Sequence, residues 1–175
     1  MRIEETITIN HGIYQYIPLR TAMTILEKIV SCLTKNNISY AIVGGYAVAL
    51  HGAPRGTIDV DLVIRLEEAA YIALEAALKS IGMVPRLPVT AREVLRFRRE
   101  YIERRNLIAW SFYNPENPLE MVDVIITENL DDFSLIEKKI FSAKIKVISK
   151  KDLIKMKERS GRPQDLLDVE ALKKL

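Results

Sequence analysis

Hydrophobic and polar residues recur along this chain with two different periods. The run Tyr40–Val43 is apolar, breaks at two glycines and passes into a short helical segment that ends at His51-Gly52. From Ile58 to Ile64 polar and apolar residues alternate, so three aliphatic side chains fall on one face of an extended strand. The pattern therefore predicts a strand, a short helix and a second strand whose apolar face lies in a core.

The other predicted elements follow from the same two periods. Helical spacing of apolar residues predicts helices at residues 18–35, 67–81, 91–105 and 150–175, the last one interrupted at 161–163. Strand-like runs predict a hairpin of 107–113 with 119–127, joined by Asn-Pro-Glu-Asn-Pro, and one more strand at 140–148. Two prolines predict a loop at 83–89, and Thr90 with Glu93 has the form of a capping box.

Strands and helices alternate along most of the chain, which favours an α/β or α+β fold in which helices cover a β-sheet. At 175 residues the chain has the length of one domain. We expect a single domain, 1–175, with an N-terminal arm at 1–17, a core at 18–149 and a C-terminal helical extension at 150–175. Residues 6–9 alternate in a way that also permits a short strand within the arm.

Two aspartates lie on the polar face of the predicted strand at 58–64. Asp59 and Asp61 are two residues apart, and side chains at this spacing point to the same side of a strand. Neighbouring carboxylates repel each other unless a cation lies between them. Oxygen ligands of this kind suit Mg²⁺ or Mn²⁺. The pair is therefore a candidate metal site.

The glycine pair Gly44-Gly45 precedes this strand by one short helix. Without a Cβ the backbone can turn sharply and a ligand can approach it closely. Free N–H groups at the start of the following helix favour phosphate oxygens. A phosphate-binding turn next to an acidic metal site is what a nucleoside triphosphate requires.

A third aspartate, Asp123, stands among β-forming residues in the predicted strand at 119–127. Burial of an aspartate without partners is costly. One interpretation places this strand beside that of Asp59 and Asp61, so that Asp123 completes a single metal site. The other interpretation places Asp123 at a strand end that faces solvent.

Composition sets further limits. Hydrophobic residues make up 49% of the chain and charged residues 28%, which is typical of a soluble globular protein, and the net charge of +3 mildly favours anionic ligands. The apolar runs are shorter than a membrane span, and the first residues include acidic ones. We therefore expect a cytoplasmic protein with no membrane partner. Cys32 has no second cysteine to pair with and is expected to be a small buried residue.

Two further features have more than one interpretation. The predicted helix at 91–105 contains six arginines against three glutamates. Its charged face is either solvated with local ion pairs or contacts the phosphates of a nucleic acid or nucleotide. His51 is expected to pack or hydrogen-bond locally, because no histidine or cysteine has metal-ligand spacing to it.

The joint spacing of these residues resembles the nucleotidyltransferase superfamily, which includes polymerase beta, CCA-adding enzymes and antibiotic nucleotidyltransferases. The resemblance rests on Gly44-Gly45, His51-Gly52, Arg55-x-Thr57-x-Asp59-x-Asp61 and Asp123. The C-terminal run from Asp152 to Asp168 is similar to small prokaryotic members related to AbiEii toxins. Many members have Gly-Ser where this chain has Gly44-Gly45, so a serine contact to phosphate is missing.

The resemblance implies a mixed sheet and two-metal chemistry. Asp59, Asp61 and Asp123 would hold two Mg²⁺ or Mn²⁺ ions, and Asp123 would be the general base. The implied nucleotide-binding residues are Gly44, Gly45 and Tyr46, through backbone amides, and Arg55, Thr57 and Lys157, through side chains. Arg55 could equally pair with Asp59 or Asp61 in the absence of metal. A structural ion-pair arrangement that docks the last helix is expected for Arg162, Asp165 and Asp168.

The resemblance implies transfer of a nucleoside monophosphate from an NTP, with ATP expected, to an acceptor hydroxyl with release of pyrophosphate. The acceptor could be a small molecule, an RNA end or a protein. Two alternatives remain open: a toxin–antitoxin component that acts mainly by binding a partner protein, and an inactive nucleotide-binding domain. A homodimer is compatible with either reading.

Overall fold

The computed structural model describes residues 8–9, 13–14, 23–140 and 143–175 of the chain. Most of the N-terminal arm expected at 1–17 lies outside these residues, as do residues 18–22 of the first predicted helix. Within the arm, the structure shows an antiparallel pair of two short strands, β1 (Thr8–Ile9) and β2 (Ile13–Tyr14). None of the described helices is long and apolar enough to cross a membrane.

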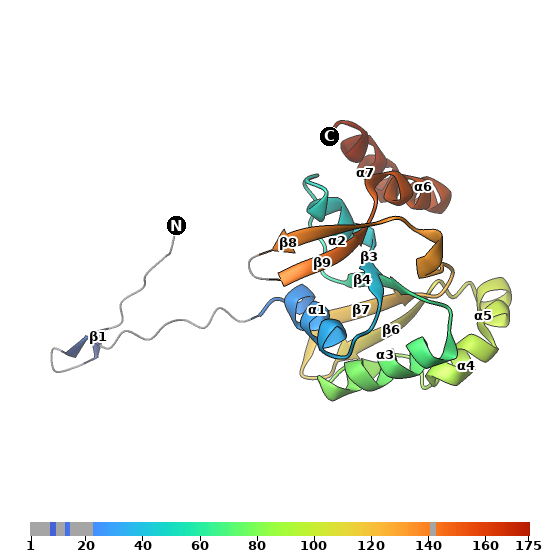
Figure 1. Ribbon diagram of the computed structural model, residues 1–175, viewed down its shortest axis with the longest axis horizontal. Helices are drawn as coiled ribbons and strands as arrows, with labels where there is room; N and C mark the ends of the chain where they lie inside the picture. The colour runs from blue at the N-terminus through green and yellow to red at the C-terminus, as the bar shows by residue number, and fades with distance from the viewer. Residues whose placement is uncertain (1–7, 10–12, 15–22, 141–142) are drawn as a thin grey trace.

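A mixed sheet of seven strands forms the centre of the described fold, in the order β5-β6-β7-β4-β3-β9-β8 (Figure 1). Its strands are β3 (Tyr40–Ile42), β4 (Val60–Ile64), β5 (Val84–Pro85), β6 (Ala109–Asn114), β7 (Asn117–Ile125), β8 (Leu135–Ile140) and β9 (Ala143–Ile148). The central strand β4 runs antiparallel to β3 and parallel to β7. Strand β3 in turn runs parallel to β9. The mixed sheet expected from the sequence is confirmed.

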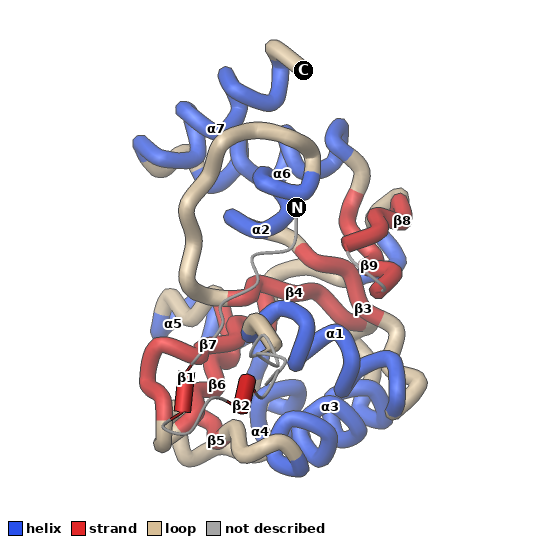
Figure 2. The backbone as a smooth tube through the Cα atoms, turned by 90° about the vertical axis from the view of Figure 1, so that its left-hand side faces the viewer, coloured by secondary structure: helices blue, strands red, loops and turns tan. Residues whose placement is uncertain are grey.

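Helices cover both sides of this sheet. Along the chain they are α1 (Ile25–Lys35), α2 (Gly44–Leu50), α3 (Glu68–Ser80), α4 (Ala91–Arg96), α5 (Arg98–Arg105), α6 (Lys150–Ser160) and α7 (Pro163–Lys173). Figures 1 and 2 show α1, α3 and α4 on one side and α2, α6 and α7 on the other. The C-terminal helices thus lie on the same side as the short helix that follows the glycine pair.

The core is thickest between the sheet and the layer of α1, α3 and α4. Trp110 and Phe112 of β6 are fully buried, and the Trp110 ring stacks on Tyr71 of α3 with ring centroids 6.1 Å apart. Val60, Leu62 and the other inward side chains of β4 are also buried. The alternation at residues 58–64 therefore has the predicted outcome, with the apolar face in the core and the aspartates on the other face.

Most predicted element ends have local causes that the sequence already contains. The Thr90–Glu93 capping box is present, with each side chain bonded to the other residue's backbone amide. Helix α3 is followed by Gly82 in the left-handed region, and Gly161 ends α6 in the same way before Pro163 begins α7. Cys32 is buried as expected, and its Sγ lies 3.2 Å from the Ala77 carbonyl oxygen.

Two predicted elements need correction, and one strand, β8, is additional to those expected. The helix expected at 91–105 is broken at Phe97 into α4 and α5, and after the break Arg98 turns toward the end of β7, where it donates to the carbonyls of Ile126 and Thr127. The strand expected at 140–148 is present as β9, and it forms the second arm of a hairpin. Its first arm, β8, is an edge strand with charged residues at three consecutive positions, 137–139, which hide the apolar alternation. Strand β5 lies in the predicted loop at 83–89 and uses an edge position, where proline is tolerated.

We expect the central strand to carry a large share of the stability. Leu62→Ala removes a fully buried side chain from β4, and it should lower the free energy of unfolding by about 2–5 kcal/mol because a cavity is left behind. Leu119→Ala on the neighbouring β7 is the matched control, since Leu119 is 67% exposed. Urea unfolding followed by circular dichroism measures the free energy of unfolding of both variants. Equal effects of the two substitutions would contradict the burial assigned to β4.

Candidate functional site

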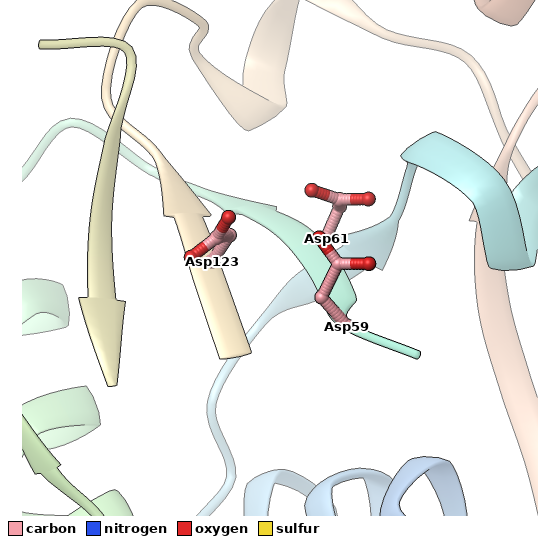
Figure 3. A group of neighbouring side chains, drawn as sticks. All are labelled: Asp59, Asp61 and Asp123. Atoms are coloured by element: carbon pink, nitrogen blue, oxygen red, sulfur yellow. The ribbon is translucent and has the colours of Figure 1, made fainter. Parts of the chain in front are cut away.

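Three carboxylates converge on the face of the sheet that carries α2, α6 and α7. Asp59 directly precedes β4, Asp61 lies in β4, and Asp123 lies in β7 opposite Asp61 in the parallel pairing. One carboxylate oxygen from each residue lies within 4.8 Å of the others. Figure 3 shows the side chains standing together above two adjacent strands. All three are partly buried, so the solvent-facing alternative for Asp123 is wrong.

The convergence makes Asp61 hard to ionise. Burial, followed by the charges of Asp59 and Asp123, raises the pKa of Asp61 to about 7 from 3.8, although a hydrogen bond from the Gly45 amide and the charge of Lys157 act in the other direction. A divalent cation between the carboxylates would remove this repulsion. Three carboxylates are a hard oxygen donor set of the kind that Mg²⁺ and Mn²⁺ take, so the residues present fit such an ion.

The glycine turn lies directly against Asp61. Gly44 begins α2 with φ at +60°, and a Cβ placed on it would lie 1.8 Å from Asp61 Oδ2. The backbone amide of Val43 donates to the Asp61 carbonyl oxygen at 3.0 Å, which joins the end of β3 to β4 at this point. Only glycine fits at position 44, because both its conformation and the nearby carboxylate exclude a side chain.

The position of Thr57 accounts for the glycine at residue 45. A Cβ at Gly45 would lie 2.6 Å from Thr57 Oγ1 and 2.7 Å from Thr57 Cβ. The hydroxyl of Thr57 therefore lies close to where a serine side chain at position 45 would begin. It also donates to Asp59 Oδ1 at 3.2 Å. The chain thus lacks a serine in the turn but keeps a hydroxyl beside it, contributed by another segment.

Tyr46 follows the glycines on α2, and its ring packs against the core. Burial, with a smaller contribution from the charge of Asp59, raises the pKa of its phenol. The contact predicted for Tyr46 is through its backbone amide at the start of α2, and this contact stays a prediction. His51 ends the same helix, and its Nε2 lies 3.0 Å from the Ile148 carbonyl oxygen. His51 is thus hydrogen-bonded as expected, although its partner is a backbone carbonyl 97 residues away in the sequence.

The C-terminal helices place a buried ion-pair cluster beside the carboxylates. Lys157 Nζ lies 2.8 Å from Asp165 Oδ1 and 2.7 Å from Asp168 Oδ2, and all three residues are buried. Arg162 Nε lies 2.7 Å from Asp165 Oδ2. The ion pair expected between Arg162 and Asp165 is present. Lys157 lies at the centre of the cluster, and the nucleotide contact that the resemblance implies for it stays a prediction.

Arg55 does not form the ion pair that the sequence offered as an alternative to phosphate binding. Its Nε lies 3.3 Å from Asp168 Oδ1, so it pairs with α7 rather than with Asp59 or Asp61. The reason is tertiary: the fold brings the buried carboxylate of Asp168 on α7 within reach of the loop between α2 and β4. In the arginine-rich segment at 91–105, Arg99 Nε lies 2.9 Å from Glu103 Oε1 in a local ion pair, whereas Arg92 Nε lies 3.1 Å from Glu68 Oε1 of α3.

A pocket of about 500 Å³ opens over the three carboxylates. Its walls come from the glycine turn, the loop before β4, strands β6 and β7, and both C-terminal helices: Val43, Gly44, Gly45, Arg55, Thr57, Asp59, Asp61, Ile108, Ala109, Asp123, Ile125, Thr127, Glu128, Met156, Lys157, Arg159, Ser160, Arg162, Gln164 and Asp165. The sequence-predicted residues other than Tyr46 are therefore brought together around one space.

Some pocket residues were missed by sequence reasoning. Arg159 donates to both Glu128 carboxylate oxygens, at 2.9 and 2.8 Å, and this pair connects α6 with the segment after β7 across the pocket. On α6, residues 156, 157 and 160 share a helical face, and this spacing could have indicated from the sequence that they line the pocket together. Glu128 had no signal in the sequence, because only the tertiary structure brings it opposite Arg159.

Comparison with solved structures finds the same arrangement of elements. An antigenic nucleotidyltransferase-like protein from Paracoccidioides brasiliensis is 21% identical, with a TM-score of 0.52 over 83% of this chain and 72% of that one. The lincosamide antibiotic adenylyltransferase LnuA, solved with lincomycin bound, is 17% identical, with a TM-score of 0.56 over 85% and 94%. The antibiotic-resistance factor ANT(2'')-Ia is 14% identical, with a TM-score of 0.56 over 85% and 79%.

This chain has the nucleotidyltransferase fold. No protein-family model matches the sequence, and a search of the curated proteins gives no significant match. The likeness therefore rests on the three-dimensional arrangement. In this nucleotidyltransferase fold the carboxylates, the glycine turn and the pocket occupy one side of the sheet. Its closer placement in an AbiEii-related branch stays a prediction.

We expect the metal-free protein to show the ionisation cost of Asp61. Its folded-state pKa of about 7 lies above the ordinary 3.8. The carboxyl therefore favours folding below the ordinary value, and this contribution is lost as the pH rises through about 7. Asp61→Asn removes the effect. In EDTA, the free energy of unfolding of Asp61→Asn minus that of the wild type should therefore increase by roughly 2–3 kcal/mol between about pH 5 and about pH 8.

Urea unfolding at the two pH values measures this difference, and added Mg²⁺ should stabilise the wild type at the higher pH but not Asp61→Asn. A constant difference between the two proteins at both pH values would contradict the raised pKa.

We also expect the close approach at Gly45 to matter for the metal site. Gly45→Ala pushes Thr57 away from Asp59, and overpacking of this kind costs about 1–3 kcal/mol. Gly56→Ala is the matched control, because no atom lies within 4 Å of a Cβ built at Gly56. Urea unfolding and titration with Mn²⁺ measure stability and metal affinity. If Gly56→Ala weakens Mn²⁺ binding as much as Gly45→Ala does, the contact with Thr57 is not responsible.

Proposed function

We propose that this protein is a metal-dependent nucleotidyltransferase, which transfers a nucleoside monophosphate from an NTP, with ATP expected, to an acceptor hydroxyl. The observation that carries the proposal is the convergence of Asp59, Asp61 and Asp123 beside the glycine turn in a pocket of about 500 Å³. A metal-binding acidic cluster next to backbone that accommodates phosphate is the arrangement this reaction needs.

In the proposed reaction the acceptor oxygen attacks the α-phosphorus of the NTP. A new P–O bond forms as the bond to the bridging oxygen of the β-phosphate breaks, and pyrophosphate leaves with that electron pair. Asp123 takes the acceptor proton, because it lies on β7, the strand that also contributes Ile125 to the pocket wall assigned to the acceptor. Two Mg²⁺ or Mn²⁺ ions held by Asp59, Asp61 and Asp123 would neutralise charge on the phosphates and acidify the attacking hydroxyl.

The glycine turn and its neighbours bind the triphosphate in this proposal. Gly44 and Gly45 allow phosphate oxygens to approach the backbone, and the amides of Gly45 and Tyr46 donate to them. The Thr57 hydroxyl and the Arg55 guanidinium complete this side of the site. Their placement around Asp59 and Asp61 in the pocket supports the assignment.

The acceptor lies on the opposite wall in this proposal. Ile108, Ala109 and Ile125 give that wall an apolar surface, and the Glu128–Arg159 ion pair adds charge at its edge. A small molecule with an apolar part and a hydroxyl fits this chemistry. Among proteins of the same fold, LnuA was solved with lincomycin and ANT(2'')-Ia with adenylyl-2''-tobramycin. RNA ends and protein hydroxyls remain the other acceptor classes to test.

Substitution of the carboxylates tests the reaction. Asp59→Asn and Asp123→Asn should each lower Mg²⁺-dependent pyrophosphate release and transfer of label from the α-phosphate by about a hundredfold or more. Asp131→Asn is the control, since Asp131 is exposed and pairs with Arg65 outside the pocket. The acceptor panel should contain lincosamides, aminoglycosides, RNA and host proteins, and circular dichroism checks folding.

Transfer that is unaffected by Asp59→Asn would exclude the proposed chemistry. Absence of transfer across the panel, together with a stable complex between the protein and a host protein that survives Asp59→Asn, would instead support the toxin–antitoxin alternative. Binding of NTP without turnover would support the inactive nucleotide-binding domain.

A further inference from the structure

A buried lysine and two buried carboxylates form the centre of the C-terminal helices. Lys157 of α6 and the two aspartates of α7, Asp165 and Asp168, are each at most 5% exposed. The ammonium group lies between the carboxylates, at 2.8 Å from Asp165 Oδ1 and 2.7 Å from Asp168 Oδ2. Removal of Lys157 would leave two buried carboxylates without their shared cation, and removal of either aspartate would take one of two partners from the buried ammonium, so each change is costly.

Each carboxylate also holds an arginine of the pocket wall. The second oxygen of Asp165, Oδ2, accepts from Arg162 Nε at 2.7 Å. Asp168 Oδ1 lies 3.3 Å from Arg55 Nε and accepts from Gln164 Nε2 at 3.0 Å. Both arginines line the pocket that contains Asp59 and Asp61. The cluster thus connects the buried lysine to two guanidinium groups at the site.

The cations of this cluster differ in how many donors remain for a ligand. An ammonium has three N–H donors, and two of those on Lys157 are used by buried carboxylates. A guanidinium has five donors. Arg162 uses Nε and one terminal nitrogen on Asp165, and its side chain is 71% exposed. Arg55 Nε is buried beside Asp168, and Nη1 donates to the Gly56 carbonyl oxygen, which leaves Nη2 for a ligand.

The charges of the cluster complement the acidic site. Three cationic side chains face two carboxylates, so the cluster keeps one positive charge next to the three aspartates. The hydrogen bond to Asp165 raises the pKa of Arg162, and the nearby charges of Asp61 and Asp59 add to this effect. Although burial raises the pKa of Asp165, hydrogen bonds from Arg162 and Lys157 lower it well below its usual range. The carboxylate therefore stays ionised and keeps its hold on Arg162.

We propose that Arg162, with Arg55, binds the triphosphate of the nucleotide, and that Lys157, Asp165 and Asp168 are positioning residues that hold the two guanidinium groups toward it. This inference rests on the proposed function and reverses two sequence-based roles, because Lys157 acts indirectly and Arg162 contacts the ligand. A planar guanidinium binds phosphate through two parallel hydrogen bonds, and orientation by a buried carboxylate reduces the entropy lost on binding.

The test uses Mg²⁺-tripolyphosphate and a non-hydrolysable ATP analogue as probes, with affinity measured by calorimetry on the full chain. Arg162→Ala should raise the Kd of both probes by about tenfold or more, and Arg162→Lys should recover only part of the loss because an ammonium cannot form the bidentate contact. In transfer assays the same substitutions should raise KM for the NTP more than they lower kcat. Arg99→Ala, at an arginine that is 87% exposed on α5, is the control for loss of one surface charge.

A double-substitution cycle separates positioning from stability. Asp165→Asn should raise the Kd of tripolyphosphate by about fivefold in the wild-type background and by less than about twofold in the Arg162→Ala background, because Asp165 acts through Arg162. The melting temperature of each variant is measured in parallel. If Asp165→Asn does not fold, the two substitutions at the exposed Arg162 still decide the question.

An Arg162→Ala protein that binds both probes as the wild type does would overturn the inference, as would a wild type that binds neither probe. Loss of binding in Lys157→Met at unchanged melting temperature, with Arg162→Ala unaffected, would return the phosphate contact to Lys157. The outcomes also separate this inference from the proposed function. Transfer that persists with no effect of Arg162→Ala rejects the inference alone, whereas Arg162-dependent binding of tripolyphosphate without transfer to any acceptor rejects the proposed reaction alone.

Discussion

The parallel pairing of β4 with β7 is the constraint on which the site depends. It places Asp61 opposite Asp123 on one face of the sheet while Leu62 and Val124 pair on the buried face. A slip of one residue would turn the carboxylates into the core and the aliphatic side chains into the pocket, so burial of the apolar face fixes the register. The antiparallel pairing of β3 with β4 then brings the glycine turn against Asp61.

This register creates an electrostatic problem that the rest of the molecule partly relieves. The three carboxylates repel one another, and Asp61 is difficult to ionise without a cation. The C-terminal helices contribute Lys157 and Arg162 to the pocket, and Asp168 of α7 pairs with Arg55 from the loop before β4. Negative charge on the sheet and positive charge on the helices thus lie on opposite sides of one pocket. Such a separation suits a ligand that carries both divalent cations and phosphates.

Some pocket residues belong to a sequence motif, and others come from segments that have no recognisable motif. The glycine turn and the acidic strand belong to a short continuous stretch, 44–61, and keep their geometry through local contacts such as that of Thr57 with Asp59. The apolar wall at Ile108 and Ile125 and the Glu128–Arg159 pair come from three separate segments. The fold is shared with proteins of 14–21% identity, and a shared fold leaves the acceptor open, because function depends on the residues that fill such walls.

The sequence by itself determined the elements and most of the acidic site. Alternation at 58–64 decided which face of β4 is buried, and an aspartate among β-forming residues favoured partners for Asp123. Local signals such as the Thr90 capping box and Gly161 set helix ends. The tertiary structure alone decided the pairing of Arg55 with Asp168, the burial of Lys157 between two aspartates and the meeting of Glu128 with Arg159. These contacts join residues from different elements, and the sequence offers each charged residue many partners of opposite sign, of which the packing brings only a few within reach.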